Sequence, residues 1–361
     1  AAFWDNRLYL DFTYYKTDSR NQILKLATTA ASGYTSQVRN AGHIRNRGYE
    51  IQLGAVPIQT SKGFRWNLDL NYGANSSKVV KLDDEGLITS YQLYSSGIQI
   101  LASVGEAYGT LFGTSYVRDA NGNVVVDANG LPKISTTNKT LGKFTPDWTG
   151  GISNTFSYRS LSLSFLIDAS VGGSIFSNTN KTGKYTGVLA NTLSGRDAEH
   201  GGLWYYTDAM GNNVRLPESP SYSVSSDGLY YAQVNGQSTR VYQDGIMVEG
   251  VTESGSKNEE VVSAEKYYHR IYSIAEANVY DASYVKLREV ALSYRLPRLW
   301  TQKLHLQEAS VTLTGRNLWT IYKSVPNIDP ESALTTGNAQ GVEAYSLPTT
   351  RSFGVNLSVK F

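Results

Sequence analysis

The C-terminal residues of the chain read Arg351-Ser352-Phe353-Gly354-Val355-Asn356-Leu357-Ser358-Val359-Lys360-Phe361. The odd-numbered residues from Phe353 onward are apolar, and the even-numbered residues are polar or glycine. This period of two predicts a β-strand with one apolar and one polar face. About ten such residues allow a tilted strand to cross a bilayer. The stretch therefore predicts a strand that faces lipid on one side.

The same alternation recurs throughout the chain. In residues 160–172, for example, Leu161, Leu163 and Phe165 alternate with Ser162 and Ser164. We expect further strands in residues 7–15, 20–28 (the weakest pattern), 48–56, 63–75, 148–158, 160–172, 283–295 and 308–320. With the C-terminal strand, the sequence predicts an all-β chain of about nine strands.

One of these segments changes phase. In residues 283–295, Val285 and Leu287 share one parity, whereas Val290 and Leu292 share the other. A β-bulge inserts one extra residue into a strand and so restores the facing of the residues after it. We therefore predict a bulge near Arg288-Glu289.

The segments between the strands alternate in length. Short connections are expected at residues 17–19, 57–62, around 159, and 296–307. Long connections rich in Gly, Ser, Asn, Thr and Tyr are expected near residues 29–46, 76–147, 173–282 and 321–350. Short periplasmic turns and long extracellular loops are typical of outer-membrane β-barrels. A water-soluble β-sandwich also fits the mean hydropathy of −0.32, but it rarely sorts its loops in this way.

Aromatic residues gather near the ends of the predicted strands, as expected of the two membrane interfaces. The periplasmic group would hold Phe12, Tyr14, Phe64, Trp66, Phe156, Tyr158, Tyr294 and Phe361. The outer group would hold Tyr49, Tyr72, Trp148 and Trp319. The alternative is that aromatic residues simply favour strands, which predicts no clustering at strand ends.

Composition excludes several classes of protein and site. The 361 residues include no Cys, which rules out disulfides and thiolate metal sites. A net charge of +2 gives no reason to expect a nucleic-acid partner. The first five residues, Ala1–Asp5, lack an initiator Met and the features of a signal peptide. We expect a processed product or a piece of a longer polypeptide.

The predicted number of strands also bears on closure of the barrel. With nine strands, the first and the last run in the same direction, whereas closed bacterial barrels have an even number of strands. We therefore expect the remaining strands to come from upstream polypeptide or from another chain.

Several phrases, taken together and in this order, resemble the C-terminal barrel portion of the SusC/RagA family of TonB-dependent outer-membrane transporters. The phrases are Asn40-Ala41-Gly42, Asn46-Arg47-Gly48-Tyr49-Glu50, the pair Asp119-Ala120-Asn121-Gly122 and Asp127-Ala128-Asn129-Gly130, Pro146-Asp147-Trp148-Thr149-Gly150-Gly151, Asp281-Ala282-Ser283-Tyr284-Val285-Lys286-Leu287-Arg288-Glu289-Val290, Leu296-Pro297, Gly315-Arg316-Asn317-Leu318-Trp319, Asp329-Pro330-Glu331, Leu347-Pro348, Arg351-Ser352-Phe353 and Phe361. Each phrase is weak alone, and together they cover most of the chain.

The resemblance implies a 22-stranded transmembrane antiparallel β-barrel, of which residues 1–361 would form the C-terminal part. It also implies an N-terminal plug and a TonB box, neither of which has a counterpart in these residues, and a SusD-like surface lipoprotein as a lid. Phe361 would be the C-terminal aromatic that serves as the signal for barrel assembly. The implied location is the outer membrane of a Gram-negative, Bacteroidetes-like bacterium.

Aromatic side chains in the 173–282 segment are the candidates for contact with a substrate or the lid. Flat rings with polar tips suit sugar rings, peptides and protein interfaces. The candidates are Trp204, Tyr205, Tyr206, Tyr230, Tyr231, Tyr267 and Tyr268. The alternative is that these rings pack a small core of the loop itself.

Charged residues on the polar faces of the strands would line the inner wall. The candidates are Asp69, Asp168, Lys286, Arg288 and Arg316. We expect them to contact the plug or to pair with one another in a wet lumen; the alternative is that they contact the substrate.

The sequence offers little support for catalysis or metal binding. None of the four His residues has another His at a ligand spacing. Asp83-Asp84-Glu85 is better read as a solvated loop tip than as a Ca²⁺ site, and the two Asp-Ala-Asn-Gly stretches as turns. A barrel enzyme would need a supported His at the outer rim; His43 and His200 have no such support in sequence. We expect no enzyme activity, cofactor or metal.

The hypothesis from sequence is TonB-dependent import of a glycan or peptide nutrient together with a SusD-like lipoprotein. The alternative is a passive porin-like or adhesin barrel without energy coupling. Whether a plug and TonB box precede Ala1 would discriminate between the two.

Overall fold

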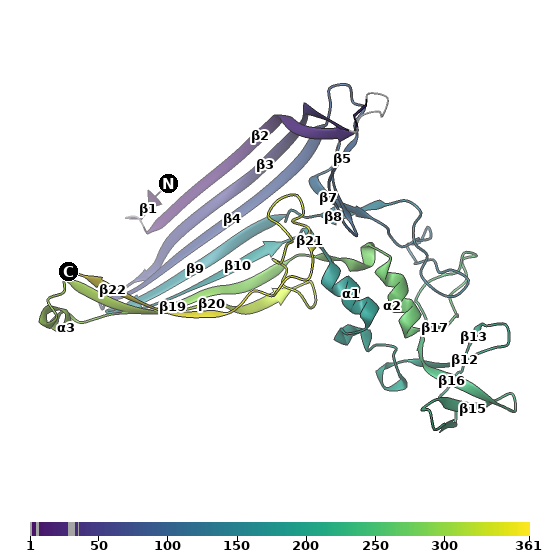
Figure 1. Ribbon diagram of the computed structural model, residues 1–361. Coiled ribbons are helices and arrows are strands. Elements are labelled where there is room, and N and C mark those ends of the chain that lie inside the picture. The colour runs from purple at the N-terminus through teal and green to yellow at the C-terminus, as the bar shows by residue number, and fades with distance from the viewer. Residues whose placement is uncertain (1, 5–6, 28–32, 35) are drawn as a thin grey trace.

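The structure is a computed structural model that describes residues 2–4, 7–27, 33–34 and 36–361. Its main element is one antiparallel sheet of nine strands that forms a curved, open wall (Figure 1). In order across the sheet, the strands are β1 (Ala2–Phe3), β2 (Leu8–Ala27), β3 (Ser36–Gln59), β4 (Phe64–Lys81), β9 (Trp148–Tyr158), β10 (Leu161–Val171), β19 (Tyr284–Arg295), β20 (Glu308–Lys323) and β22 (Ser352–Lys360).

The strand register places the apolar residues on one face of this sheet. Leu357 pairs with Val311, and Leu292 pairs with both Leu313 and Leu163. Farther along, Phe156 pairs with Leu163 and Trp66. Because side chains alternate between faces, these pairs continue one apolar surface from strand to strand. Leu357 is 65% exposed, so this surface lacks a protein partner in the described part of the chain.

The bulge predicted in β19 is confirmed. Leu166 pairs with Glu289 and Ile167 with Leu287, so Arg288 is left out of the pairing with β10. The pairing with β20 shifts at the same point. The extra residue turns both Arg288 and Glu289 toward the polar face, where Arg288 contacts Asp168.

The N-terminal strands differ from the prediction. Residues 7–15 and 20–28 were expected as two strands joined by a turn at 17–19, but β2 is continuous over Leu8–Ala27. Its polar middle pairs with β3, and Asn21 and Gly42, both with positive φ, make an irregularity without ending the strands. Two predicted strands thus merge into one, and the short β1, which was not predicted, brings the number in the sheet back to nine.

The continuous β2 also corrects the predicted aromatic groups. Phe12 and Tyr14 were assigned to the periplasmic group, yet their rings lie 6.2 and 5.2 Å from Tyr49 of the other group. In contrast, Trp66 and Phe156 do lie together near the end of the sheet with short turns, with ring centroids 5.6 Å apart.

Connections at the two ends of the sheet differ, as predicted. The short ones are residues 60–63, 159–160 and 296–307; the last of these contains α3 (Arg298–Lys303). The long ones, residues 82–147, 172–283 and 324–351, lie at the opposite end (Figure 1). The predicted loop at 29–46 is wrong in part, because residues 36–46 belong to β3; residues 28–32 and 35 lie outside the described residues.

The long connections contain their own secondary structure. Residues 82–147 form a four-stranded sheet of β5 (Ser90–Ser95), β6 (Gln99–Ser103), β7 (Tyr108–Gly113) and β8 (Lys139–Lys143). Residues 172–283 contain β11 (Ser174–Ser177), α1 (Asn178–Thr186), η2 (Ala190–Thr192), η3 (Ala198–His200), β12 (Leu203–Thr207), β13 (Asn213–Arg215), β14 (Tyr222–Val224), β15 (Tyr230–Val234), β16 (Gln237–Ile246), β17 (Val262–Ser263), α2 (Ala264–Tyr272), η4 (Glu276–Asn278) and β18 (Val279–Asp281). Residues 324–351 contain β21 (Val342–Glu343).

The buried apolar clusters lie at the long-loop end of the molecule. One cluster unites Ile100 and Leu111 of the first long connection with Phe176 of the second and Val342 of the third. The three connections therefore fold together around a shared core at one end of the sheet. In the described residues, no helix is long and apolar enough to cross a membrane.

Candidate functional site in the loops and on the inner wall

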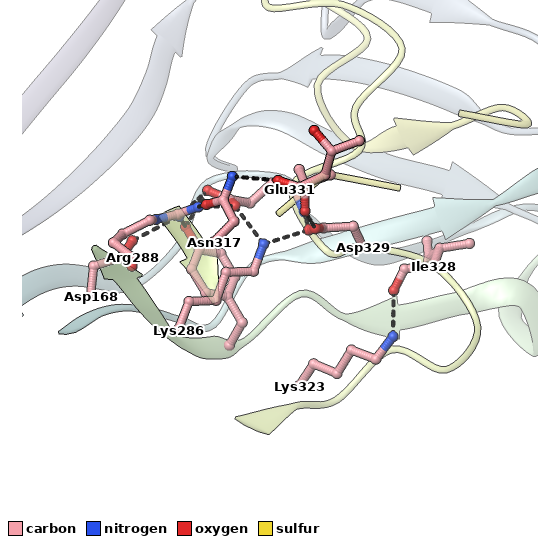
Figure 2. Close-up of polar contacts among 11 residues, drawn as sticks. Asp168, Lys286, Arg288, Asn317, Lys323, Ile328, Asp329 and Glu331 are labelled. Carbon is pink, nitrogen blue, oxygen red and sulfur yellow. Dashed lines mark hydrogen bonds and ion pairs between the residues drawn. The ribbon is translucent and has the colours of Figure 1, made fainter. Parts of the chain in front are cut away.

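A cluster of charged side chains attaches the last long connection to the polar face of the sheet (Figure 2). Lys286 of β19 is 3% exposed and donates to Asp329 at 2.7 Å and to Glu331 at 2.6 Å. Arg288 donates to Glu331 at 2.5 Å and to Asp168 of β10 at 2.8 Å. Two cations of β19 thus bind three carboxylates, one on β10 and two in the last long connection.

The electrostatics of the cluster favour ionised carboxylates. Burial alone would raise the pKa values of Asp329 and Glu331. Hydrogen bonds, chiefly from Lys286 to Asp329 and from Arg288 and Lys286 to Glu331, outweigh burial and hold both pKa values below their usual range. The hydroxyl of Thr349 also donates to Asp329. The cluster therefore holds residues 324–351 against the wall as a set of ion pairs.

The structure brings most of the predicted wall residues together by mutual pairing. Asp168, Lys286 and Arg288 meet in this cluster, and Arg316 pairs with Glu289 of the neighbouring strand at 2.8 Å. Asp69 lies on β4 and forms no ion pair within the described ranges. Of the two alternatives, the structure shows pairing for four of these residues; contact with a plug stays a prediction.

Several predicted aromatic residues pack a small hairpin core. Trp204 and Tyr205 on β12 are 7% and 4% exposed. The Trp204 ring stacks on Tyr222 at 5.1 Å and meets Tyr230 edge-on at 5.8 Å. The Tyr205 hydroxyl donates to Asp244 at 3.2 Å. Trp204 and Tyr230 therefore pack the hairpin core, and Tyr205 stacks on Tyr242 with ring centroids 5.1 Å apart. Packing within the loop was the second alternative for these rings.

The other predicted aromatic residues occupy different places. Tyr206 packs beside the same hairpin core, and Tyr231 of β15 is half-buried. Tyr267 and Tyr268 lie on α2, apart from the hairpin, and line a cavity between two of the long connections.

A buried carboxylate missed by sequence reasoning joins the second and third long connections. Glu343 is 0% exposed and accepts hydrogen bonds from Ser177 at 2.7 Å and from the Thr179 hydroxyl at 2.5 Å. It also accepts from the Thr179 backbone N–H at the start of α1, where negative charge is favoured. The partners are separated by more than 160 residues in sequence, so no local pattern marks this contact.

Replacing Ser177 with Ala is expected to destabilise the outer loops by about 1–2 kcal/mol, because Ser177 caps α1 and also donates to Glu343. The expected result is faster amide hydrogen exchange in α1. Ser263→Ala is the matched control, since Ser263 likewise caps a helix, α2, where its hydroxyl oxygen accepts one hydrogen bond of 3.3 Å from the Lys266 N–H. If the α1 amides exchange equally fast in Ser177→Ala and in Ser263→Ala, the role given to the Ser177–Glu343 contact is wrong.

The two Asp-Ala-Asn-Gly stretches form turns, as the sequence predicted. Asp119 accepts from the backbone N–H groups of Asn121 and Asn123, and Asp127 accepts from those of Asn129 and Leu131. The predicted solvated loop tip is wrong for Asp83, which is 6% exposed and accepts from the N–H groups of Leu87 and Ile88, whereas Asp84 and Glu85 are exposed. Within the described ranges, no group of three or more His, Asp or Glu side chains is placed to hold a metal ion.

The two His residues considered for a barrel enzyme each have a carboxylate partner. His43 lies 2.5 Å from Asp18, and His200 lies 2.7 Å from Asp197. A nucleophilic triad also requires a hydroxyl bonded to the imidazole. Among the residues that the structure describes, no side-chain hydroxyl bonds to either ring. These pairs are therefore incomplete as triads.

Comparison with known proteins reveals similarity over the whole chain. No family model matches. The chain is 27% identical over 390 residues to TonB-dependent receptor P3 and 24% identical over 389 residues to TonB-dependent receptor P26, both of Formosa agariphila. Each alignment spans 100% of this chain and 33% of the receptor. The chain therefore spans about a third of the length of the curated relatives it matches.

Solved structures show the same fold. The structure of the RagAB peptide transporter matches with a TM-score of 0.61 at 18% identity, over 100% of this chain and 34% of the other. The RagAB peptide importer in its closed-closed state matches with a TM-score of 0.62 at 19% identity, with the same coverage. These likenesses confirm the predicted resemblance and show that the sheet is a portion of an all-β barrel.

Proposed function

We propose that this chain, which resembles SusC/RagA-type TonB-dependent receptors in sequence and fold, forms part of the wall of an outer-membrane barrel that imports nutrients. The observation that carries the proposal is the continuous apolar face of the sheet, with an opposite face of polar and paired charged groups. A sheet with these two faces fits between lipid and a wet lumen.

The substrate in this proposal is a glycan or a peptide, taken up from the side of the long connections. The solved neighbours are described as a peptide transporter and a peptide importer, which supports a peptide. The long connections fold together around a common core and lie at one end of the wall, as a receiving surface would (Figure 1). A SusD-like lipoprotein would cover that surface.

Energy for import would come from TonB acting on a plug inside the closed barrel. The sheet has two free edges, at β1 and at β22, which further strands would join to close the wall. We propose that further polypeptide supplies these strands, the plug and the TonB box. In this account the chain carries out no covalent chemistry, and its location is the outer membrane of a Gram-negative bacterium.

Uptake measurements test this proposal against a passive barrel. Cells that make the full-length protein would receive fluorescein-labelled casein peptides or labelled neutral oligosaccharides, with and without the protonophore CCCP. We expect uptake of one class of probe that stops when CCCP is added, and no uptake in cells without the gene. Gene-dependent uptake that continues in CCCP would instead indicate a passive barrel.

A further inference from the structure

A cavity of about 720 Å³ lies between the first and second long connections. Its lining comes from α2, from the segments on either side of η3, from the end of β16 and from residues 116–132 of the first connection. Most of its walls are apolar or aromatic, including Ile246, Ile271, Tyr267 and Tyr268. The cavity is large enough for a small organic group of one or two sugar or amino-acid units.

Ion pairs between the two connections fix the walls of this cavity. Arg270 of α2 pairs with Asp127 at 2.9 Å and donates to the carbonyl of Pro132 at 3.0 Å. Arg118 pairs with Glu276 at 2.5 Å. The Tyr268 hydroxyl is held by the carbonyl groups of Asn191 and Ser194, each at 3.1 Å. The cavity is therefore built from tied segments and is formed in advance of any ligand.

A buried cation without a carboxylate partner borders the cavity. Lys184 of α1 is 9% exposed and donates to the carbonyl of Ala277 at 2.8 Å and to Asn278 at 3.3 Å. The ammonium also lies over the ring of Tyr280, 5.2 Å from its centroid, so it contacts a carbonyl, an amide oxygen and an aromatic face. Lys184 forms no ion pair in the described part of the chain, and burial lowers its pKa to about 8. A buried charge ordinarily has a partner of opposite sign.

Two phenol hydroxyls add unused donors to the same cavity. The hydroxyls of Tyr116 and Tyr267 have no hydrogen-bond partner among the described residues. The two side chains lie close enough to interact: burial and then Tyr267 raise the pKa of Tyr116, so both stay protonated donors at neutral pH. The carboxylate in the lining, Glu249, is exposed and does not pair with Lys184.

We propose that this cavity binds a carboxylate carried on a small body, with Lys184 as its counter-ion and the hydroxyls of Tyr116 and Tyr267 as further donors. The inference rests on the proposed import function and names a chemical class for its cargo. The carboxylate could belong to an acidic sugar or to the C-terminus of a peptide. In either case the apolar walls and the Tyr ring faces would hold the rest of the unit.

Calorimetry on the full-length protein in detergent tests the proposal with paired probes. One pair is digalacturonate and neutral digalactose; the other is the peptide Ala-Tyr-Ala with a free or an amidated C-terminus. We expect an acidic member to bind at least about tenfold more tightly than its neutral partner. The pair that shows the difference identifies the source of the carboxylate. Equal binding of acidic and neutral members in both pairs, or no binding at all, would overturn the proposal.

Three variants assign the binding to the cavity. Lys184→Met should weaken the acidic probe by about tenfold or more, and Tyr267→Phe by about twofold to tenfold. Lys181→Met is the matched control: Lys181 lies on the same helix, with its ammonium over the Tyr272 ring at 4.2 Å, outside the cavity lining. Tyr267→Phe removes only a hydroxyl without a partner, so it reports on binding even if Lys184→Met fails to fold. Unchanged binding in Tyr267→Phe and in a folded Lys184→Met would contradict the assignment.

The pH dependence supplies a second readout. Binding of the acidic probe should be strongest at about pH 6–7, fall by about half at pH 8 and weaken about tenfold per pH unit above about pH 9, as Lys184 loses its proton. Tyr280, whose ring lies against the Lys184 ammonium, has a pKa raised by burial and stays neutral over this range. Binding without this decline would exclude Lys184 as the counter-ion. The carboxylate site and the import proposal can fail separately, because uptake in the presence of CCCP is a separate measurement. Selective binding of the acidic probe together with uptake that continues in CCCP would reject energised import and leave the carboxylate site intact.

Discussion

Replacing Lys286 with Met is expected to release residues 324–351 from the inner wall. Lys286 is 3% exposed and donates to both Asp329 and Glu331, so its removal leaves the buried Asp329 without a cation, whereas the more exposed Glu331 keeps Arg288. Breaking a buried pair by removing one partner typically costs about 3–5 kcal/mol. Met keeps most of the aliphatic volume of Lys, so the loss would report on charge and hydrogen bonding more than on packing.

Amide hydrogen exchange of residues 324–351 in the full-length protein measures this release. The matched control is Arg295→Ala on the same strand as Lys286, because Arg295 pairs with Glu308 of β20 at an exposed site, with side chains 69% and 50% exposed, and exposed pairs contribute only about 0–1 kcal/mol. Exchange in Lys286→Met that is no faster than in Arg295→Ala would contradict the anchoring role.

Acid should release the same segment. The pKa values of Asp329 and Glu331 are lower in the folded protein than in the unfolded chain. Their contribution to stability is therefore complete above the unfolded pKa values of about 4 and is lost as pH falls through the folded values. We expect protection of residues 324–351 at neutral and mildly acidic pH, and its loss only below about pH 4.

The second large effect concerns the apolar face of the sheet. Leu163→Arg and Leu357→Arg should each hamper assembly by about 2–4 kcal/mol, because each would place a charge in the hydrocarbon region of the bilayer. Ser164→Lys and Asn356→Lys are the matched controls one residue along each strand, on the polar face. They should be tolerated, since a Lys there would face the wet lumen.

Folding into lipid vesicles, followed by urea titration, measures this difference. Barrels of the Leu→Arg variants should unfold at lower urea concentration than the Ser164→Lys and Asn356→Lys barrels. Equal effects in both pairs of variants would mean that the facing assigned to β10 and β22 is wrong.

Period-two alternation predicted the wall well, because a strand with one face in lipid needs an apolar side chain at every second residue. The phase change between Leu287 and Val290 even located the bulge at Arg288. Alternation failed at residues 17–19, where β2 continues as a polar strand paired with residues 44–46 of β3. No apolar period is needed there, because backbone pairing with β3 and the contacts of Asp18 with His43 and Arg45 hold the strand.

The contacts of the loops were less predictable, because their partners are distant in sequence. Aromatic residues in the 173–282 segment were recognised, but nothing local distinguishes Trp204, which packs a hairpin core, from Tyr267, which lines a cavity. Lys184 and Glu343 were missed for the same reason. Their environments arise only when separate connections fold together.

Spin-label accessibility along β22 tests the central claim, that this sheet is a lipid-facing barrel wall, most directly. The 361 residues contain no Cys, so single Cys residues can be introduced at each position from Ser352 to Lys360 of the protein in vesicles and labelled with a nitroxide. We predict strict alternation: labels at Phe353, Val355 and Leu357 collide mainly with oxygen dissolved in lipid, and labels at Gly354, Asn356 and Ser358 collide mainly with a water-soluble nickel complex. Uniform access of the nickel complex to all positions would contradict the account.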